Sequence, residues 1–283
     1  MRGQAMSKRS GATPDQVRTW IASGDGQGEG KNFKPFFHVR DVPSEGRSSM
    51  LKGLKTGGRH HHYVSDGEYG IHILAEWDPR VRDIREQYAL LPWEETQEIA
   101  DNLNIRHPTY PGTSTPIVVT SDAVLTVYDN VGASQAVISS KPHNKIYPKN
   151  AKSVRVLEKL LIEKMYWLRR KTPWCLSTDD MLPNTLINNL DILRVNVIAT
   201  ELDYLNVHLA DFCNAFVDSW SQYKTFGNLL DTCAIKMHLV RKEAYAIFSR
   251  VIWSRILLLD IRSEPLDLLL PLKQPSISGS TAT

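Results

Sequence analysis

The sequence has little of what a secreted or membrane protein requires. Its three cysteines, Cys175, Cys213 and Cys233, are odd in number and far apart, so they indicate neither a disulfide framework nor a zinc knuckle. No apolar run approaches the roughly 18 residues that span a bilayer. The first residues, MRGQAMSKRSGATPD, lack the apolar centre of a signal peptide. We therefore expect a soluble, cytoplasmic protein of a reducing compartment, with no membrane partner.

The net charge is small, but it is unevenly distributed. The 283 residues contain 34 Lys+Arg and 31 Asp+Glu, which gives +3. Residues 1–60 hold eleven Lys and Arg against five acids, a net +6 that leaves −3 for the remainder. Such clustering is typical of a protein that binds a polyanion, because Lys and Arg release counterions from phosphates. An ordinary solvated basic face explains the same charge equally well.

The hydrophobic periodicity predicts an α/β domain that ends near Asp180. With 42% hydrophobic residues the chain can build a sizeable core, and its length suits one large domain or two. We expect a disordered tail over residues 1–14, then a catalytic domain over 15–180. GDGQGEGK at residues 24–31 predicts a flexible loop, FKPFFHVRDV at 33–42 an extended segment, and SEGRSSMLKGLKTGGRHHHYV at 44–64 a basic, glycine-rich loop. The expected elements are helices at 15–22, 65–78 and 153–170, strands at 81–91 and 173–178, and a hairpin of strands 115–128 and 134–142.

The helix expected at 153–170 is amphipathic, with apolar residues at 154, 157, 160/161, 165 and 168. Beyond Asp180 the pattern is mainly helical, and LLLDI and PLDLLLPL are candidates for two small strands. We expect residues 181–272 to form a helical, winged-helix-like domain and residues 273–283 to form a disordered tail. The fold class is thus α/β with a mixed sheet flanked by helices, followed by a smaller, mostly α domain.

Three residues lie at the ends of the central elements of the first domain and could carry chemistry. Glu68 lies on the first helix, Asp122 in a strand, and Lys141 at the end of the next strand. Two converging carboxylates bind Mg²⁺ through hard oxygen ligands. The metal activates a water, and a nearby lysine stabilises charge on a phosphate. The pattern is typical of metal-dependent DNA cleavage.

Each of these residues also has a purely structural explanation. Ser65-Asp66-Gly67-Glu68 fits a capping box, in which Glu68 only satisfies a backbone amide. An aspartate such as Asp122 also occurs at a strand edge or bulge. Lys141 precedes Pro142 at a strand end, where a solvated lysine is common. The residues alone leave both interpretations open.

The run His60-His61-His62 invites a metal interpretation. Successive residues of an extended chain point to opposite faces, so three in a row seldom form one site. No Cys/His spacing supports zinc. We expect these histidines in a loop near phosphate. For contacts with the DNA backbone we select Lys31, Arg40, Arg47, Arg59 and Lys145.

Several blocks of the sequence resemble one known family. GQGEGKNFKPFFHVRDVPSEGRS at residues 26–48 and VSDGEYGIHILAEWDPRVRDIREQYALLP at residues 64–92 are similar to TnsA, the endonuclease subunit of heteromeric cut-and-paste transposases. TSDAVL, SSKP, EKLLIEKMYW and PWCLSTD follow in the same order as their counterparts there. The resemblance covers residues 20 to 180 well, and the last hundred residues only by length and helical character.

The resemblance implies a restriction-endonuclease-like catalytic domain. It also implies a winged-helix-like domain that contacts the AAA+ regulator TnsC. TnsA-type subunits nick transposon-end DNA at the 5′ ends of the element, while the DDE transposase TnsB cuts the 3′ ends. By motif position, the family's metal-binding glutamate and aspartate match Glu68 and Asp122, and its lysine matches Lys141. The implied cofactor is Mg²⁺, with Mn²⁺ as a substitute, and the implied location is on bacterial DNA in the cytoplasm.

One position departs from the family pattern. The family has a Q-x-K pair on the strand that follows the aspartate, and its glutamine matches Ser139 here. Serine is shorter, so direct contact of this side chain with a metal is lost unless a carbonyl or water substitutes. We expect Ser139 to support the catalytic set. The alternative is a noncatalytic adaptor that docks DNA between the DDE transposase and the AAA+ regulator. A third possibility is a repair or restriction nuclease of the same fold, which would cut DNA alone.

Overall fold

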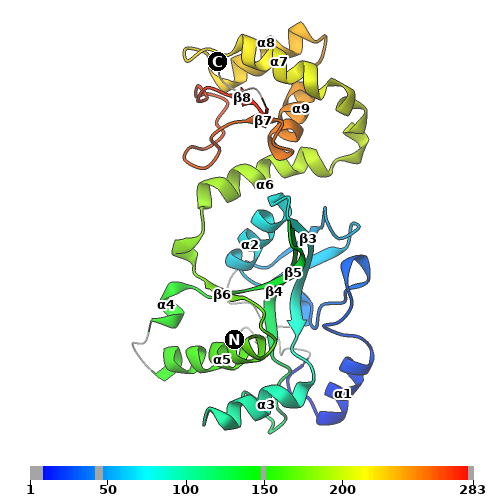
Figure 1. Ribbon diagram of the computed structural model, residues 1–283, viewed down its shortest axis with the longest axis vertical. Helices are drawn as coiled ribbons and strands as arrows, with labels where there is room; N and C mark the ends of the chain where they lie inside the picture. Colours follow the sequence, from blue (N-terminus) through cyan, green and yellow to red (C-terminus); the bar gives the residue numbers. More distant parts are fainter. Residues whose placement is uncertain (1–8, 42–46, 148–150, 280–283) are drawn as a thin grey trace, which may run out of the picture. The chain divides into compact units, whose positions relative to one another are not determined.

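The structure is a computed structural model that describes residues 9–41, 47–147 and 151–279. It divides into two compact units, Met1–Leu182 and Pro183–Thr283 (Figure 1). The division lies two residues from the position expected from the sequence. Each unit has its own secondary structure and core, and each is described by itself.

The first unit has a helix near its beginning and a four-stranded sheet at its centre. Its helices are α1 (Pro14–Ala22), α2 (Asp66–Trp77), α3 (Trp93–Asn102), α4 (His143–Ile146) and α5 (Ala151–Arg169). Its strands are β1 (Ser49–Lys52), β2 (His60–Tyr63), β3 (Val81–Ala89), β4 (Thr120–Asp129), β5 (Gly132–Ser140) and β6 (Trp174–Ser177). Short 3-10 helices span Gly30–Asn32, Val39–Asp41 and Asp179–Met181.

The central sheet is mixed, as expected. Its strand order is β3-β4-β5-β6, with antiparallel pairing from β3 to β5 and parallel pairing of β5 with β6. The two faces of the sheet alternate along each strand because successive side chains point in opposite directions. Val124 and Val137 pack with α3 and α5. Ala123 and Leu125, one residue away, pack with α2 on the other face (Figure 1).

The residues before α1 are packed, and this corrects the expected tail over residues 1–14. Ala12 is 2% exposed and belongs to a core cluster with Val17 and Phe36. The Arg9 guanidinium lies over the rings of Trp20 and Phe36 and pairs with Asp25 at 3.2 Å. These aromatic and ionic contacts order a polar stretch that local sequence marks as unstructured. Residues 1–8 lie outside the described part of the chain.

Three features of the first unit differ from the sequence-based expectation. The basic, glycine-rich stretch expected to be a loop contains the antiparallel hairpin β1–β2. Helix α3 was not anticipated. The expected apolar face of α5 was wrong in part, because Leu160 is buried and Met165 packs against the core, but Val154, Leu161 and Leu168 are 47%, 39% and 58% exposed. The buried residues of α5 are Ser153, Leu160, Ile162, Glu163, Tyr166 and Trp167.

The histidine run lies in β2, and His61 is fully buried in an ionic network centred on Glu86. Arg59 forms two contacts with the Glu86 carboxylate at 2.7 and 2.9 Å, and His61 Nδ1 lies 2.8 Å from Glu86 Oε2. Burial alone raises the pKa of Glu86, but hydrogen bonds from His61 and Arg59 outweigh it and hold that pKa at about 2. The expectation that these histidines form a loop near phosphate was wrong. They tie β2 to β3.

The second unit is mainly helical. It contains α6 (Asn184–Ile198), a 3-10 helix (Thr200–His208), α7 (Leu209–Ser219), α8 (Phe226–Lys236) and α9 (Arg241–Trp253). Four buried phenylalanines from three helices, Phe212, Phe216, Phe226 and Phe248, form ring contacts in its core. LLLDI supplies β7 (Leu257–Leu258), but PLDLLLPL does not supply its partner. The partner is β8 (Ser276–Ile277), inside the expected tail at 273–283.

The described part of the chain contains no helix that is both long and apolar enough to cross a membrane. The three cysteines are free thiols, with Cys175 exposed and the other two buried.

The Glu86 network predicts a large stability difference between buried and exposed ion pairs. Glu86→Gln leaves the 8%-exposed Arg59 side chain with an uncompensated buried charge, so we expect a loss of about 3–5 kcal/mol in the free energy of unfolding. Asp15→Ala removes an exposed pair with Arg18, whose expected contribution is about 0–1 kcal/mol. Denaturant unfolding of both variants checks this. If both variants lose the same free energy of unfolding, the Glu86 network is solvated.

Candidate active site

Three of the expected catalytic residues lie at one end of the sheet, where β4 begins and β5 ends. Asp122 is one residue beyond the last paired positions of these strands, Ala123 and Ile138. By strand alternation, Asp122 and Ser139 share the face that Val124 and Val137 present to α5. Lys141 is the residue directly after β5, and its side chain lies beside Asp122. The sheet therefore brings three side chains from two strands to one end of the same face.

Glu68 approaches from the first turn of α2. Ser65 caps this helix, and its hydroxyl accepts the Glu68 N–H at 3.2 Å. The Glu68 carboxylate accepts the Val64 N–H at 3.1 Å and the Ser65 hydroxyl at 3.0 Å. It also accepts the Gln87 amide at 3.0 Å, a contact beyond the cap that links α2 to β3. Glu68 thus accepts a backbone amide, but that of Val64 and not that of the cap residue Ser65, and it also contacts Gln87 of β3.

Gln87 is a site residue that the sequence reasoning missed. In the β3–β4 ladder, Glu86 pairs with Ala123 and Tyr88 with Ser121, which leaves Gln87 opposite Asp122. Its φ of 49° is in the left-handed region, a conformation that costs a non-glycine residue roughly 1–2 kcal/mol. Its amide donates to Glu68 and its Oε1 accepts the Thr120 hydroxyl at 3.4 Å. The strained backbone directs the buried amide toward the acidic residues, and this conformation has no reliable local sequence signal.

Lys141 and Asp122 form the closest oppositely charged pair of the site. Lys141 Nζ lies 3.0 Å from Asp122 Oδ2, and the same oxygen accepts the Ser140 N–H at 2.8 Å. Lys141 also donates to the Ser140 carbonyl at 2.7 Å. Burial opposes the charge of Lys141, but the Asp122 carboxylate outweighs it and the pKa of Lys141 is raised. The lysine remains a cation beside the acidic residues.

A further acidic residue, Glu163, reaches the site from α5. The Ser139 hydroxyl donates to Glu163 Oε1 at 2.5 Å, and the Trp174 indole donates to the Ser139 oxygen at 3.2 Å. Ser139 is fully buried and Glu163 is 5% exposed. The sequence reasoning missed Glu163 because it assigned a different face of this helix to the core.

The acidic residues of the site repel one another. Burial, and next the negative charge of Asp122, raise the pKa of Glu68 to about 7. The same two causes, in the same order, raise the pKa of Glu163 to about 7. Asp122 is therefore the common neighbour of two carboxylates that are costly to ionise. Additional positive charge at this point would relieve the repulsion.

These residues line one cavity of about 1020 Å³. Glu68, Gln87, Asp122, Lys141 and Glu163 all contribute to its wall. Two exposed lysines, Lys145 before α5 and Lys159 on α5, also line it. Burial, together with the positive charges of Arg155 and Lys141, lowers the pKa of Lys159. The cavity thus combines acidic residues in its wall with cations that can approach a phosphate.

The five residues selected for DNA contact lie in three different surroundings. Lys145 lines the cavity, and Lys31, Arg40 and Arg47 are exposed elsewhere in the first unit. Arg59 is removed from the set because its side chain is 8% exposed and is bound to Glu86. Part of the N-terminal basic excess is likewise used internally, since Lys34 pairs with Asp25 and Lys55 donates to the carbonyls of Ala75 and Val81.

The donor set suits a hard divalent cation with few protein ligands. Within residues 9–41, 47–147 and 151–279, no three His, Cys, Asp or Glu side chains are grouped closely enough to hold a metal. Mg²⁺ does not require such a cage, because it takes one or two carboxylates and keeps several waters. Glu68 and Asp122 supply two carboxylates. Burial, and next the charge of Asp122, raise the pKa of Glu68, and a cation at this point would offset the charge of Asp122. These two residues are the candidates for holding the metal.

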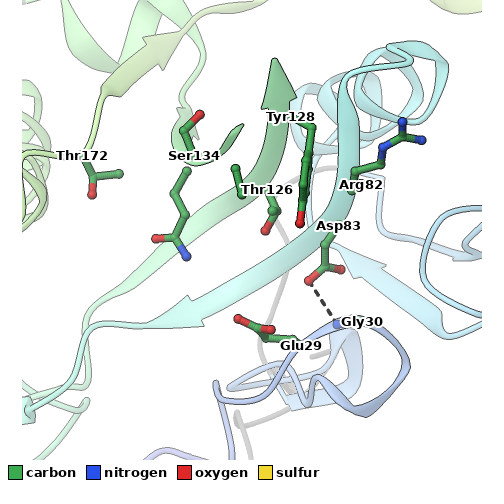
Figure 2. Close-up of a pocket in the computed structure, with 10 residues that line it drawn as sticks. Glu29, Gly30, Arg82, Asp83, Thr126, Tyr128, Ser134 and Thr172 are labelled. Carbon is green, nitrogen blue, oxygen red and sulfur yellow. Dashed lines mark hydrogen bonds between the residues drawn. The ribbon is translucent and has the colours of Figure 1, made fainter. Parts of the chain in front are cut away.

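A second hollow, of about 710 Å³, lies over the far end of the same sheet (Figure 2). Its acids are already used within the protein. Asp83 accepts the Gly30 N–H at 3.0 Å and lies 3.5 Å from Arg85, which also lies 3.8 Å from Glu29. We assign no chemistry to this hollow.

Two comparisons with known proteins bear on the first unit. Residues 78–179 match the family model described as TnsA-like endonuclease N terminal. This range contains Gln87, Asp122, Ser139, Lys141 and Glu163, whereas Glu68 precedes it.

Over 178 residues the chain is 36% identical to the Transposon Tn7 transposition protein TnsA of Escherichia coli. The alignment covers 63% of this chain and 62% of that relative, so the match spans less than two thirds of either protein. The residues that the family model matches include all four strands of the mixed sheet, with Asp122 and Lys141 at one end. Over these residues the chain is similar in sequence to TnsA-like endonucleases.

Proposed function

We propose that this protein is a Mg²⁺-dependent DNA endonuclease subunit of a transposase that nicks donor DNA at the 5′ ends of the transposon. One observation carries the proposal. Glu68 from α2, Asp122 from β4 and Lys141 after β5 line a single cavity, and Lys141 Nζ is 3.0 Å from Asp122. Residues 54 and 19 positions from Asp122 in the sequence are thus brought to one place with the chemistry of phosphodiester hydrolysis.

Each residue has a distinct role in this proposal. Glu68 and Asp122 hold the cation, with Gln87 and the cap of α2 fixing the Glu68 carboxylate. When bound, Mg²⁺, or Mn²⁺ in its place, supplies an activated water and neutralises charge on the scissile phosphate. Lys141 lies beside Asp122 as a compact cation that can orient that water or bind a phosphate oxygen. Lys145 and Lys159 hold the DNA backbone at the cavity.

The partners follow from the family resemblance. The relative in Escherichia coli is named a transposition protein. For this chain we propose transposon-end DNA as substrate and a TnsB-like DDE transposase that cuts the 3′ ends. A TnsC-like AAA+ regulator would bind the helical second unit, residues 183–283.

A noncatalytic adaptor is the second candidate, and one observation favours it. Ser139 occupies the family's glutamine position, and its hydroxyl donates to Glu163 and accepts the Trp174 indole, so its contacts are made within the protein. An adaptor would dock DNA in the same cavity and bridge the DDE transposase to its ATPase without cutting.

Strand-resolved cleavage of transposon-end DNA in Mg²⁺, with the partner transposase present, separates the two candidates. We expect wild type to produce the 5′-strand nick, and Asp122→Ala to lose at least about 100-fold of it while the 3′ cuts persist, because a cation ligand is removed. Asp15→Ala, on the exposed face of α1, is the matched control. If wild type makes no 5′ nick while 3′ cuts occur, the protein is an adaptor. Cleavage of DNA without partners would indicate a repair or restriction nuclease instead.

The raised pKa values of Glu68 and Glu163 predict how stability depends on pH and on cations. Both values are about 7, above those of an unfolded chain, so the folded state favours the protonated acids. Their contribution to stability is fully present below about pH 4.5 and is lost as pH rises through about 7. In EDTA, the unfolding temperature at about pH 8 should therefore be lower than at about pH 6. Added Mg²⁺ should recover more of it at about pH 8.

The double variant Glu68→Gln/Glu163→Gln provides the control for this pH dependence. Without either titrating acid, the difference in unfolding temperature between the two pH values should shrink. A difference of unchanged size would place the titrating groups elsewhere in the molecule.

The two cavity lysines predict a salt-dependent contribution to DNA binding. Lys145→Ala/Lys159→Ala should weaken binding to duplexes of any sequence. The slope of log K against log salt should fall by about 2, because each phosphate contact contributes about 0.9. Arg18→Ala/Lys242→Ala removes two exposed cations outside the cavity and should change the slope little. Titration of a fluorescent duplex measures both, and equal slopes would show that DNA does not approach through this cavity.

A further inference from the structure

The cavity of the first unit is larger than the proposed chemistry requires. Its volume of about 1020 Å³ is at the upper end of the range of pockets that enclose a whole small molecule, roughly 300–1,000 Å³. A Mg²⁺ ion with six waters takes roughly 200 Å³, at about 30 Å³ for each water. The proposed function therefore leaves much of the cavity without an assigned ligand.

This remaining part has an apolar lining that the backbone joins to the acidic residues. Phe37 directly follows a residue whose N–H donates to the Gln87 carbonyl at 3.0 Å. Ile117 lies five residues before Asp122, in the segment that leads into β4, and its N–H donates to the Pro108 carbonyl at 3.0 Å. Phe37 and Ile117 are both half-buried, pack on a core cluster and line the cavity. Both side chains therefore present apolar surface to whatever occupies the cavity.

One face of α5 lines the same cavity and adds a positive charge to it. Val156, Lys159 and Glu163 are spaced by three and four residues, so they lie on one side of the helix. Glu163 is 5% exposed, whereas Lys159 is exposed. From Glu163 to Val156 the helix rises by about 10 Å. Along this distance the lining changes from a buried acid to an exposed cation and an apolar side chain.

This combination of apolar and cationic lining matches an unpaired nucleotide. Proteins that bind single-stranded nucleic acid place aromatic side chains against the bases and Lys or Arg against the phosphates. In a paired duplex the faces of the bases are stacked on one another, so only phosphates and groove edges are available to a protein. A paired duplex would therefore leave the apolar lining uncovered, whereas an unpaired base would cover it and release its water.

We propose that the cavity binds the scissile strand in an unpaired state. A base next to the cut lies against Phe37 and Ile117, and Lys145 and Lys159 hold the adjoining phosphates. The substrate class is thus DNA whose base pairs are opened at the cleavage position. The inference rests on the proposed function, because it assumes that this cavity holds the phosphate to be cut.

Binding of short single strands to the full-length protein tests the inference without cleavage, with Ca²⁺ in place of Mg²⁺. An oligothymidine strand and an abasic strand of the same length carry the same phosphates, so the ratio of their affinities reports contact with the bases. We expect wild type to bind oligothymidine about 10-fold more tightly, the scale of stacking on an aromatic side chain. Phe37→Ala should remove most of this preference and leave the salt dependence of binding unchanged.

Two further variants separate base contact from a folding defect. Phe37→Leu keeps an apolar side chain but has no ring, so it should also lose preference for oligothymidine. Tyr128→Ala is the matched control, because Tyr128 is an aromatic residue of the same sheet, is 48% exposed and lines the other hollow. It should keep the preference of wild type. The fluorescence of 2-aminopurine in the bound strand should be quenched by wild type and Tyr128→Ala, and less by Phe37→Leu.

Strand-resolved cleavage with the partner transposase present extends the test to transposon ends. Mismatches that open the base pairs around the cut should increase 5′ nicking by Phe37→Leu more than by wild type, because the variant opens these pairs less well. If Phe37 only stabilises the fold, its substitution will lower nicking of paired and mismatched ends by the same factor, and the inference is wrong.

The outcomes distinguish this inference from the proposed function. If wild type nicks the 5′ strand but binds oligothymidine and abasic strands equally, the proposed function stands and the unpaired-strand site is overturned. If wild type prefers oligothymidine through Phe37 but makes no 5′ nick, the unpaired-strand site stands and the nuclease function fails. If Tyr128→Ala loses the preference as fully as Phe37→Leu, the bases bind elsewhere and the inference is overturned.

Discussion

The first unit is organised around the burial of like charges at one end of its sheet. Burial, and next the charge of Asp122, raise the pKa of both Glu68 and Glu163, and Lys141 pairs with Asp122. Such a cluster is unfavourable for folding alone, and proteins tolerate it where function requires charge. The cluster is held by α2, α5, β4 and β5, so the packing of these elements must offset the repulsion between the acids.

Strand β3 supplies much of that resistance through two adjacent residues. Glu86 is bound to Arg59 and His61, which fixes the hairpin β1–β2 against the sheet. Gln87 bends the strand at the next position and binds Glu68. The two side chains point to opposite sides of the same strand, one into a neutralised ionic network and the other into the acidic cavity. The Glu86 ion pair thus lies next to the strained residue Gln87. Gln87 in turn holds the Glu68 carboxylate in position.

The sequence predicted the elements whose hydrophobic pattern is regular. Helix α2 and strands β3, β4, β5 and β6 were found, and with them Glu68, Asp122 and Lys141. Helix α3 was missed because few of its residues are apolar, with Trp93, Ile99 and Ala100 among the buried ones. The hairpin β1–β2 was missed because contacts with residues about 25 positions away, such as Arg59 with Glu86, determine its structure. Local sequence patterns do not reveal such ion pairs, so Arg59, which has a structural role, was predicted to contact DNA.

The serine at position 139 shows where comparison by sequence position reaches its limit. Compared with the family pattern, Ser139 is a lost ligand, and the expected consequence is a weaker site. In three dimensions the Ser139 hydroxyl donates to Glu163, 24 positions later on α5. Local sequence gives little sign of this contact, because Lys164 follows Glu163 and the apolar positions expected on this helix did not include Ile162, Tyr166 and Trp167, which are buried. Comparison by position reports only that the residue has changed, whereas the structure shows which neighbour the new side chain binds.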